Sequence, residues 1–105
     1  MAKLEIGASA SGTTVRIAKG DQVQLTLPET RTAGYSWQAV TEVSPVLAVG
    51  DDGFARASAV GGTGTHRWTL SGSQAGSAKV EMVYGRSWEP ASAAKQRFTV
   101  TIDVK

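Results

Sequence analysis

The chain has 105 residues, of which 41% are hydrophobic and 19% charged, so it can form one domain around a single apolar core. It contains no cysteine, which excludes disulfide bonds, thiolate metal sites and a cysteine nucleophile. The net charge of +2 comes from scattered Lys and Arg residues without an aromatic-rich basic cluster, which argues against nucleic-acid binding.

The beginning of the chain, residues 1–10, has no apolar stretch long enough for a signal peptide. No apolar run elsewhere approaches the roughly 20 residues of a membrane helix, so we expect no membrane partner. Two compartments stay open. The protein is either cytoplasmic, or it is the mature form of a periplasmic or secreted protein whose leader was removed.

The sequence predicts short β-strands along its whole length. They cover residues 13–18, 22–27, 37–40, 54–58, 66–70, 78–84 and 97–104. In the second, sixth and seventh of these, apolar and polar residues alternate, which is the period of a half-buried strand. The intervening segments are rich in Gly, Pro, Asp and Ser and predict turns, among them Asp51-Asp52-Gly53. Residues 91–96 favour a helix but are too few to form one alone.

Short strands separated by turns at regular spacing predict an all-β fold. We expect an immunoglobulin-like β-sandwich of about seven to eight antiparallel strands. The sequence contains no linker and no internal repeat, so residues 1–105 are expected to form one domain.

Catalytic chemistry finds little support in this sequence. His66 is the only histidine, and it stands at the start of a predicted strand, where an ordinary strand-edge histidine is the simplest interpretation. Asp51 and Asp52 precede a glycine, a composition typical of a turn. We therefore expect neither an enzyme nor a metal ion or other cofactor.

Three of the turn segments have residues suited to contact with another protein. In "TRTAGY", residues 30–35, Gly34 allows a sharp turn into the next strand. In "AVGG", residues 59–62, paired glycines allow close approach of the backbone. In "RSW", residues 86–88, an Arg and a Trp alternate after a strand has ended. In this order, the three segments resemble the NPTTGY, GxGG and RPW motifs of the chagasin-like family of cysteine peptidase inhibitors. Chain length and strand pattern are also similar to that family.

The resemblance implies that three loops at one end of the sandwich form a wedge. The wedge would plug the active-site cleft of a papain-like peptidase, such as papain or a cathepsin L-type enzyme. The first segment would approach the catalytic Cys and His of the peptidase, and the other two would meet opposite walls of its cleft. The implied peptidase-binding residues are Arg31, Thr32, Ala33, Gly34, Tyr35, Val60, Gly61, Gly62, Arg86, Ser87 and Trp88.

The aromatic residues are expected to have different roles. Trp37 and Trp68 lie on predicted strands and are expected in the core. Trp88 follows the end of a strand and is expected to be exposed for binding; the alternative is that it folds back over the end of the sandwich. Tyr35 either caps the edge of the core or touches the target, and Arg86 is either a solvated charge or a contact.

The sequence thus predicts a monomeric, reversible inhibitor of papain-like cysteine peptidases. The alternative is an immunoglobulin-like carbohydrate-binding or adhesion module that uses loop aromatics, with Trp88 and Tyr35 as a stacking platform. Inhibition of a peptidase, or a signal on a glycan array, distinguishes the two.

Overall fold

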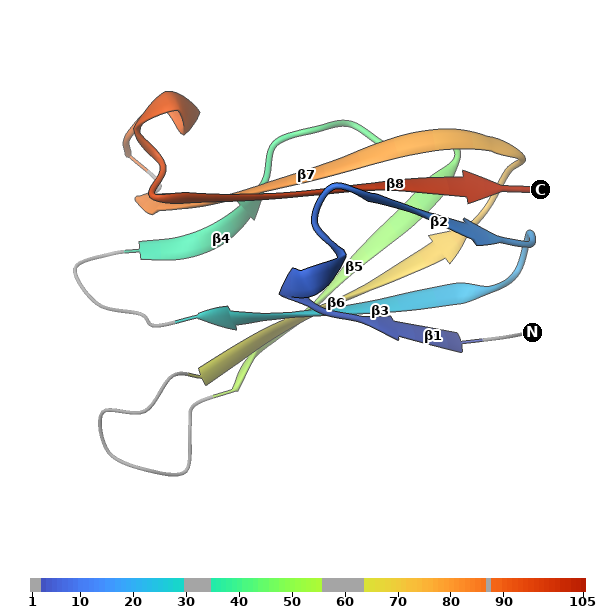
Figure 1. The fold of residues 1–105 in the computed structure, drawn as a ribbon, viewed down its shortest axis with the longest axis horizontal. Helices are drawn as coiled ribbons and strands as arrows, with labels where there is room; N and C mark the ends of the chain where they lie inside the picture. Colours follow the sequence, from blue (N-terminus) through green and yellow to red (C-terminus); the bar gives the residue numbers. More distant parts are fainter. Residues whose placement is uncertain (1–2, 30–34, 56–63, 87) are drawn as a thin grey trace.

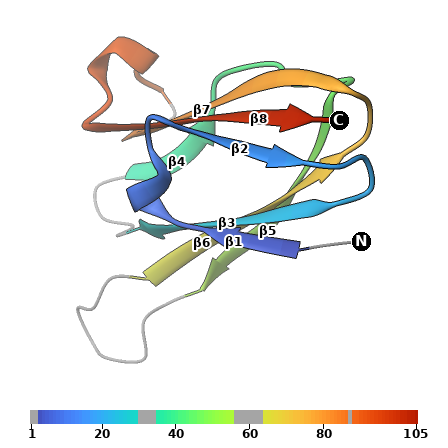
Figure 2. The ribbon, with the colours of Figure 1, turned by 45° about the vertical axis from the view of Figure 1, so that its right-hand side comes forward.

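A computed structural model describes residues 3–29, 35–55, 64–86 and 88–105. These residues form two four-stranded sheets, in the orders β1-β3-β6-β5 and β2-β8-β7-β4, which pack face to face (Figures 1 and 2). The strands are β1 (Lys3–Ile6), β2 (Thr13–Ile17), β3 (Gln22–Glu29), β4 (Tyr35–Ala39), β5 (Leu47–Ala55), β6 (Gly64–Gly72), β7 (Gly76–Arg86) and β8 (Gln96–Val104). The predicted all-β, immunoglobulin-like sandwich is confirmed.

Two short 3₁₀ helices accompany the strands, η1 (Ala8–Ala10) and η2 (Ala91–Ala93). The second lies within residues 91–96, the stretch whose composition favours a helix. Neither is long and apolar enough to cross a membrane, and no other helix occurs in the part of the chain that the structure describes.

The sheets are mixed, so the expected antiparallel pairing holds for four of the six strand pairs in the described residues and not for the other two. β1 pairs with β3 in parallel, and β2 pairs with β8 in parallel. The cause is that β1 and β3 lie in one sheet while β2, between them in sequence, runs back in the other (Figure 1). The sequence analysis missed β1, although its residues Lys-Leu-Glu-Ile alternate between polar and apolar, because a run of four residues is too short for the period to stand out.

The predicted turn at Asp51-Asp52-Gly53 was also wrong, because these residues lie inside β5. The pairing with β6 shifts between Asp51, opposite Trp68, and Gly53, opposite Arg67. One extra residue is thereby accommodated as a β-bulge, and Gly53 has the positive φ of 95° that favours glycine. The turn-like composition reflects the bulge.

The core lies between the two sheets and is formed by alternate residues of their strands. Trp37 and Trp68, with relative exposures of 6% and 3%, are both part of it, as predicted. The other buried members of this core cluster are Ile17, Val23, Leu25, Leu27, Leu47, Leu70, Ala78, Val80, Met82, Phe98, Val100, Ile102 and Val104. Burying each Val, Leu or Ile side chain contributes about 1.5–3 kcal/mol. This apolar layer holds the strand ends in place.

Candidate functional site

The strand ends that flank the three predicted binding segments lie at the same end of the sandwich (Figures 1 and 2). β3 ends at Glu29, which pairs with Gly64, the first residue of β6. β5 ends at Ala55, beside the same end of β6. β4 begins at Tyr35, which pairs with Arg86, the last residue of β7. We call this end of the molecule the loop end.

Most of the predicted binding residues fall outside the described residues. These are Arg31, Thr32, Ala33, Gly34, Val60, Gly61, Gly62 and Ser87. Tyr35, Arg86 and Trp88 are described, and Tyr35 and Arg86 are cross-strand neighbours at the loop end. Their surroundings therefore define the described part of the candidate site.

Trp88 is the most exposed large apolar residue in the described part of the chain, with a relative exposure of 69%. The backbone N–H of Glu89 donates to the carbonyl of Arg86 at 3.1 Å and closes a tight turn around it. The Arg86 guanidinium carbon lies 5.9 Å from the centre of the indole. The prediction that Trp88 is exposed is confirmed.

Tyr35 begins an aromatic stack on the inner side of β4 and β7. The centre of its ring lies 5.6 Å from the centre of the Tyr84 ring. The centre of the Tyr84 ring lies in turn 5.4 Å from that of Trp37. The Arg86 guanidinium carbon lies 4.7 Å from the Tyr35 ring centre, and the Lys95 Nζ lies 4.3 Å from it. Cations at these distances are attracted to the negative face of a ring. Half-buried Tyr35 therefore joins the core to a cationic surface.

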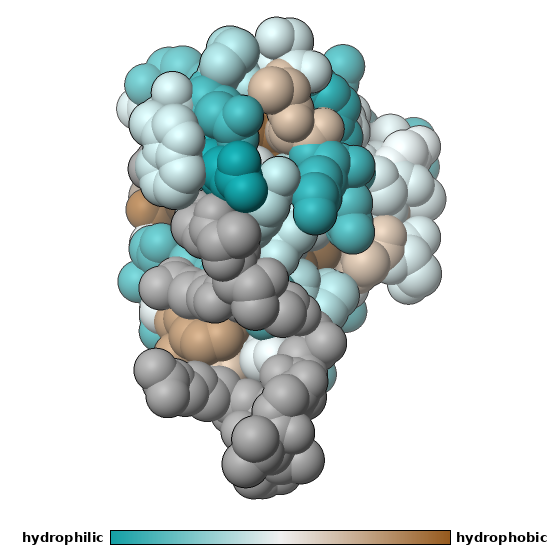
Figure 3. Space-filling model, turned by 90° about the vertical axis from the view of Figure 1, so that its left-hand side faces the viewer, coloured by the Kyte–Doolittle hydropathy of each residue, from teal (hydrophilic) through white to brown (hydrophobic). Residues whose placement is uncertain are grey.

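The cationic surface includes one residue that the sequence analysis missed. Lys95 lies just before β8, and its backbone N–H donates to the carbonyl of Tyr84 at 2.8 Å, which places it beside the stack. Hydrophilic side chains gather on the upper part of the loop end, over the sheet that contains β7 and β8 (Figure 3). No signal in the sequence connects Lys95 with Tyr35, because the two meet only through the pairing of β7 with its neighbours.

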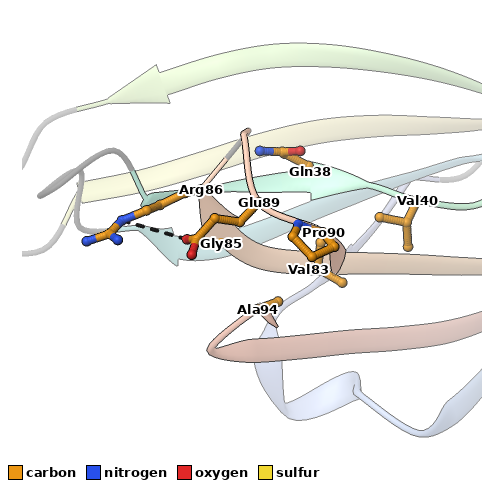
Figure 4. Close-up of a pocket in the computed structure, with 8 residues that line it drawn as sticks. All are labelled: Gln38, Val40, Val83, Gly85, Arg86, Glu89, Pro90 and Ala94. Carbon is orange, nitrogen blue, oxygen red and sulfur yellow. Dashed lines mark ion pairs between the residues drawn. The ribbon is translucent and has the colours of Figure 1, made fainter. Parts of the chain in front are cut away.

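A small pocket of about 160 Å³ is lined by Gly85 and Arg86 at the end of β7 and by Glu89, Pro90 and Ala94 after it (Figure 4). The chain after Trp88 folds back over the outer face of β7, which buries Val83 although its position in the alternation is outward. A Cβ on Gly85 would lie 3.3 Å from Ala94 Cα, so the glycine permits this close approach. The ion pair between Arg86 Nε and Glu89 Oε1, at 3.8 Å, lies among the residues that line the pocket.

The loop end also contains buried titratable groups that the sequence analysis did not predict. Glu29 and His66 are only 1% and 4% exposed. His66 Nδ1 lies 3.1 Å from Glu29 Oε1, and His66 Nε2 lies 2.6 Å from Asp51 Oδ1. Glu29 Oε1 also accepts the backbone N–H of Trp37 at 2.8 Å. We call Glu29, His66 and Asp51 together the Glu29–His66–Asp51 chain.

The interpretation of His66 as a strand-edge histidine was wrong. β6 is an inner strand between β3 and β5, and His66 shares its core-facing side with Trp68 and Leu70. Its ring stacks on Trp68 with 4.1 Å between centres and 4° between planes. The alternation of His66 with Trp68 and Leu70 was the signal that could have placed it inside. No group of His, Asp and Glu within the described ranges is arranged to hold a metal ion.

Comparison with known proteins finds relatives along most of the chain. The model of the chagasin family of peptidase inhibitors matches residues 16–102. Amoebiasin-1 of Entamoeba histolytica is 31% identical over 97 residues, which covers 90% of this chain and 93% of amoebiasin-1. Chagasin of Trypanosoma cruzi is 31% identical over 96 residues, which covers 86% of this chain and 87% of chagasin.

Solved structures share the fold. The cysteine protease inhibitor EhICP2 from Entamoeba histolytica superposes with a TM-score of 0.78 at 15% identity, covering 99% of this chain and 96% of EhICP2. Amebosin superposes with a TM-score of 0.72 at 28% identity, covering 97% of both chains. PbICP-C, solved in complex with falcipain-2, superposes with a TM-score of 0.71 at 16% identity, covering 98% of both chains. The family match over residues 16–102 and the 31% identity to amoebiasin-1 and chagasin establish that the chain belongs to the chagasin family of peptidase inhibitors.

Proposed function

We propose that this protein is a reversible inhibitor of papain-like cysteine peptidases, which it blocks by inserting its loop end into the active-site cleft. It acts by binding and has no catalytic role of its own. The observation that carries the proposal is the meeting of the flanks of all three motif segments at one end of a rigid sandwich. Family membership supports the same function.

Within this proposal, the three segments divide the cleft between them. The segment that contains Thr32 and Gly34 approaches the catalytic centre of the peptidase. Gly61 and Gly62 bring the backbone against one wall, and Trp88 meets the opposite wall. Arg31, Ala33, Tyr35, Val60, Arg86 and Ser87 complete the proposed contact set.

Trp88 has the properties expected of a binding anchor. A specific interface removes about 800 Å² of surface from each partner, and a few Trp, Tyr and Arg residues provide most of its energy. Trp88 is largely exposed, and the hydrogen bond between Glu89 and Arg86 closes the turn that contains it. Binding therefore covers apolar surface without first ordering a long loop, which reduces the entropic cost.

The relatives support cysteine peptidases as the target class. EhICP2 is described as a cysteine protease inhibitor, and PbICP-C forms a complex with falcipain-2. The target of the present protein is proposed to belong to the same class. A monomer is sufficient, because a single copy presents all three segments.

The test is a titration of the purified protein into papain and into a cathepsin L-type enzyme. We expect stoichiometric loss of activity that is recovered on dilution, with the inhibitor still intact by mass spectrometry. An absence of inhibition at micromolar concentrations of both would contradict the proposal for these targets. Binding on a glycan array without peptidase inhibition would favour the carbohydrate-binding alternative.

A further inference from the structure

We infer that the Glu29–His66–Asp51 chain positions the binding segments, and that His66 does this as a doubly protonated imidazolium. The inference rests on the proposed function, because positioning has a consequence only where the loop end binds a peptidase. The three residues are positioning residues and lie behind the proposed contact surface. Neither the motif resemblance nor family membership assigns them this role.

The chain joins the strands that flank two of the three segments. Glu29 is the residue immediately before segment 30–34, and its Oε1 also accepts the N–H of Trp37, which lies on β4 after that segment. His66 lies two residues into β6, and Asp51 lies on β5, the strands on either side of residues 56–63. One imidazole and one carboxylate oxygen therefore connect four strands from both sheets.

The hydrogen-bond geometry indicates the protonation state of His66. An ionised carboxylate only accepts hydrogen bonds, whereas a neutral imidazole has one donor and one acceptor nitrogen. Each ring nitrogen faces a carboxylate oxygen, at 3.1 Å for Glu29 and 2.6 Å for Asp51. Both contacts are satisfied at once when the ring carries two protons, so the chain has alternating negative, positive and negative charges.

The surroundings of the ring are consistent with a positive charge. The charged groups that the structure places against it are Glu29 from β3 and Asp51 from β5. Trp68, on β6 itself, stacks its indole against the ring at 4.1 Å, and an indole face attracts a cation. From the opposite sheet, Trp37 contributes a backbone N–H to the Glu29 oxygen and no charge.

Stability alone does not account for charged groups in this position. Well-packed apolar residues often stabilise a core as well as a buried ion pair does, because burial removes the ions from water. Hydrogen bonds, unlike apolar contacts, are directional and allow only a narrow range of geometries. At the loop end, the hydrogen bonds from His66 to Glu29 and Asp51 hold the end of β3, the beginning of β6 and the bulge of β5 in a single arrangement. A binding surface held in this way loses less entropy when a peptidase binds.

The experiment compares four proteins: wild type, His66→Gln, Asp51→Asn and Asp52→Asn. Asp52 is the matched control, because it occupies the same bulge as Asp51. Its carboxylate accepts a hydrogen bond from the Thr69 hydroxyl and not from His66. Inhibition of papain and thermal unfolding are measured for each across a series of pH values. We expect His66→Gln and Asp51→Asn to weaken inhibition by about tenfold or more at acidic pH through lost preorganisation. Asp52→Asn should inhibit as the wild type does.

The pH profile separates positioning from a merely structural role. At the alkaline end of the series, an imidazole that carries a single proton can donate to only one of the two carboxylates. The ratio of the inhibition constants of His66→Gln and wild type should therefore shrink toward one, whereas the Asp52→Asn ratio stays constant. Nitrogen-15 NMR should show both ring nitrogens of wild-type His66 protonated wherever the wild type inhibits more strongly than His66→Gln, and an unprotonated ring nitrogen there would overturn the imidazolium. This ratio also cancels the pH dependence of the peptidase itself.

The outcomes distinguish this inference from the proposed function. If wild type inhibits, but His66→Gln and Asp51→Asn inhibit equally well at every pH, the positioning role is overturned and the inhibitor function stands. If wild type does not inhibit, the function and the inference both fall. Should His66→Gln fail to fold, Asp51→Asn still decides, because the Asp51 side chain is 60% exposed and asparagine keeps its size.

Discussion

Trp37 donates a backbone hydrogen bond to the carboxylate of Glu29, 2.8 Å from N to Oε1, and so ties the first strand after residues 30–34 to the last strand before them. A second bond runs from the Trp37 indole Nε1 to the carbonyl of Pro28, also at 2.8 Å. The two strands belong to different sheets. One tryptophan therefore connects the two layers of the sandwich immediately behind the proposed binding surface.

The Trp37→Phe variant tests this connection. Phenylalanine keeps an aromatic ring in the core but loses the indole N–H, so the Pro28 carbonyl is left without its donor. We expect a loss of about 0.5–1.5 kcal/mol in the free energy of unfolding, the usual net contribution of one hydrogen bond, because the exposed Pro28 can bond to water instead. Urea unfolding measures it. Trp88→Phe is the control and should unfold as the wild type does, because Trp88 is largely exposed. Equal stability of all three proteins would contradict the prediction.

The Trp88→Ala variant tests the proposed anchor. Because the indole is 69% exposed in the free protein, its removal should leave the melting temperature nearly unchanged. Affinity for the peptidase should fall by about 2 kcal/mol or more, as expected for a central tryptophan in an interface. Calorimetric binding and thermal unfolding provide the two measurements. A large fall in melting temperature would instead assign Trp88 to the folded core.

The Thr32→Ala variant tests the segment proposed to approach the catalytic centre of the peptidase. Removing one hydroxyl and one methyl group from this segment should weaken inhibition while the thermal unfolding curve stays the same. The inhibition constant against papain is the measurement. Potency equal to the wild type would remove Thr32 from the proposed contacts.

The Gly64→Ala variant tests how closely β5 and β6 pack at the loop end. A Cβ on Gly64 would overlap the carbonyl oxygen of Ala55 and lie 2.6 Å from Phe54 Cζ, so the strands must separate. Overpacking of this kind costs about 1–3 kcal/mol of folding stability.

Gly50→Ala provides the matched control for Gly64→Ala. Gly50 lies on β5, where the nearest atom to an added Cβ, the Thr69 oxygen, is 3.9 Å away. This variant should be as stable as the wild type in a denaturant titration. Equal destabilisation of both variants would mean that the strand pair tolerates neither, and that close packing at Gly64 is not the cause.

Local pattern was sufficient to predict the layered β fold, since each amphipathic strand shows its own alternation of apolar and polar residues. It also predicted the places of the three tryptophans: Trp37 and Trp68 continue an alternation, and Trp88 follows its end. The pairing direction of β1 and β2 was not predictable, because it depends on which sheet each strand joins.

The sequence by itself determined the strand periodicity, the apolar core and the motif segments, because these depend on residues close together in the chain. Only the tertiary structure decided that His66 lies between two carboxylates that are 37 and 15 residues away in sequence. Those contacts exist only after β3, β6 and β5 have paired in one register, since a shift by one residue would turn the ring to the opposite face of the sheet.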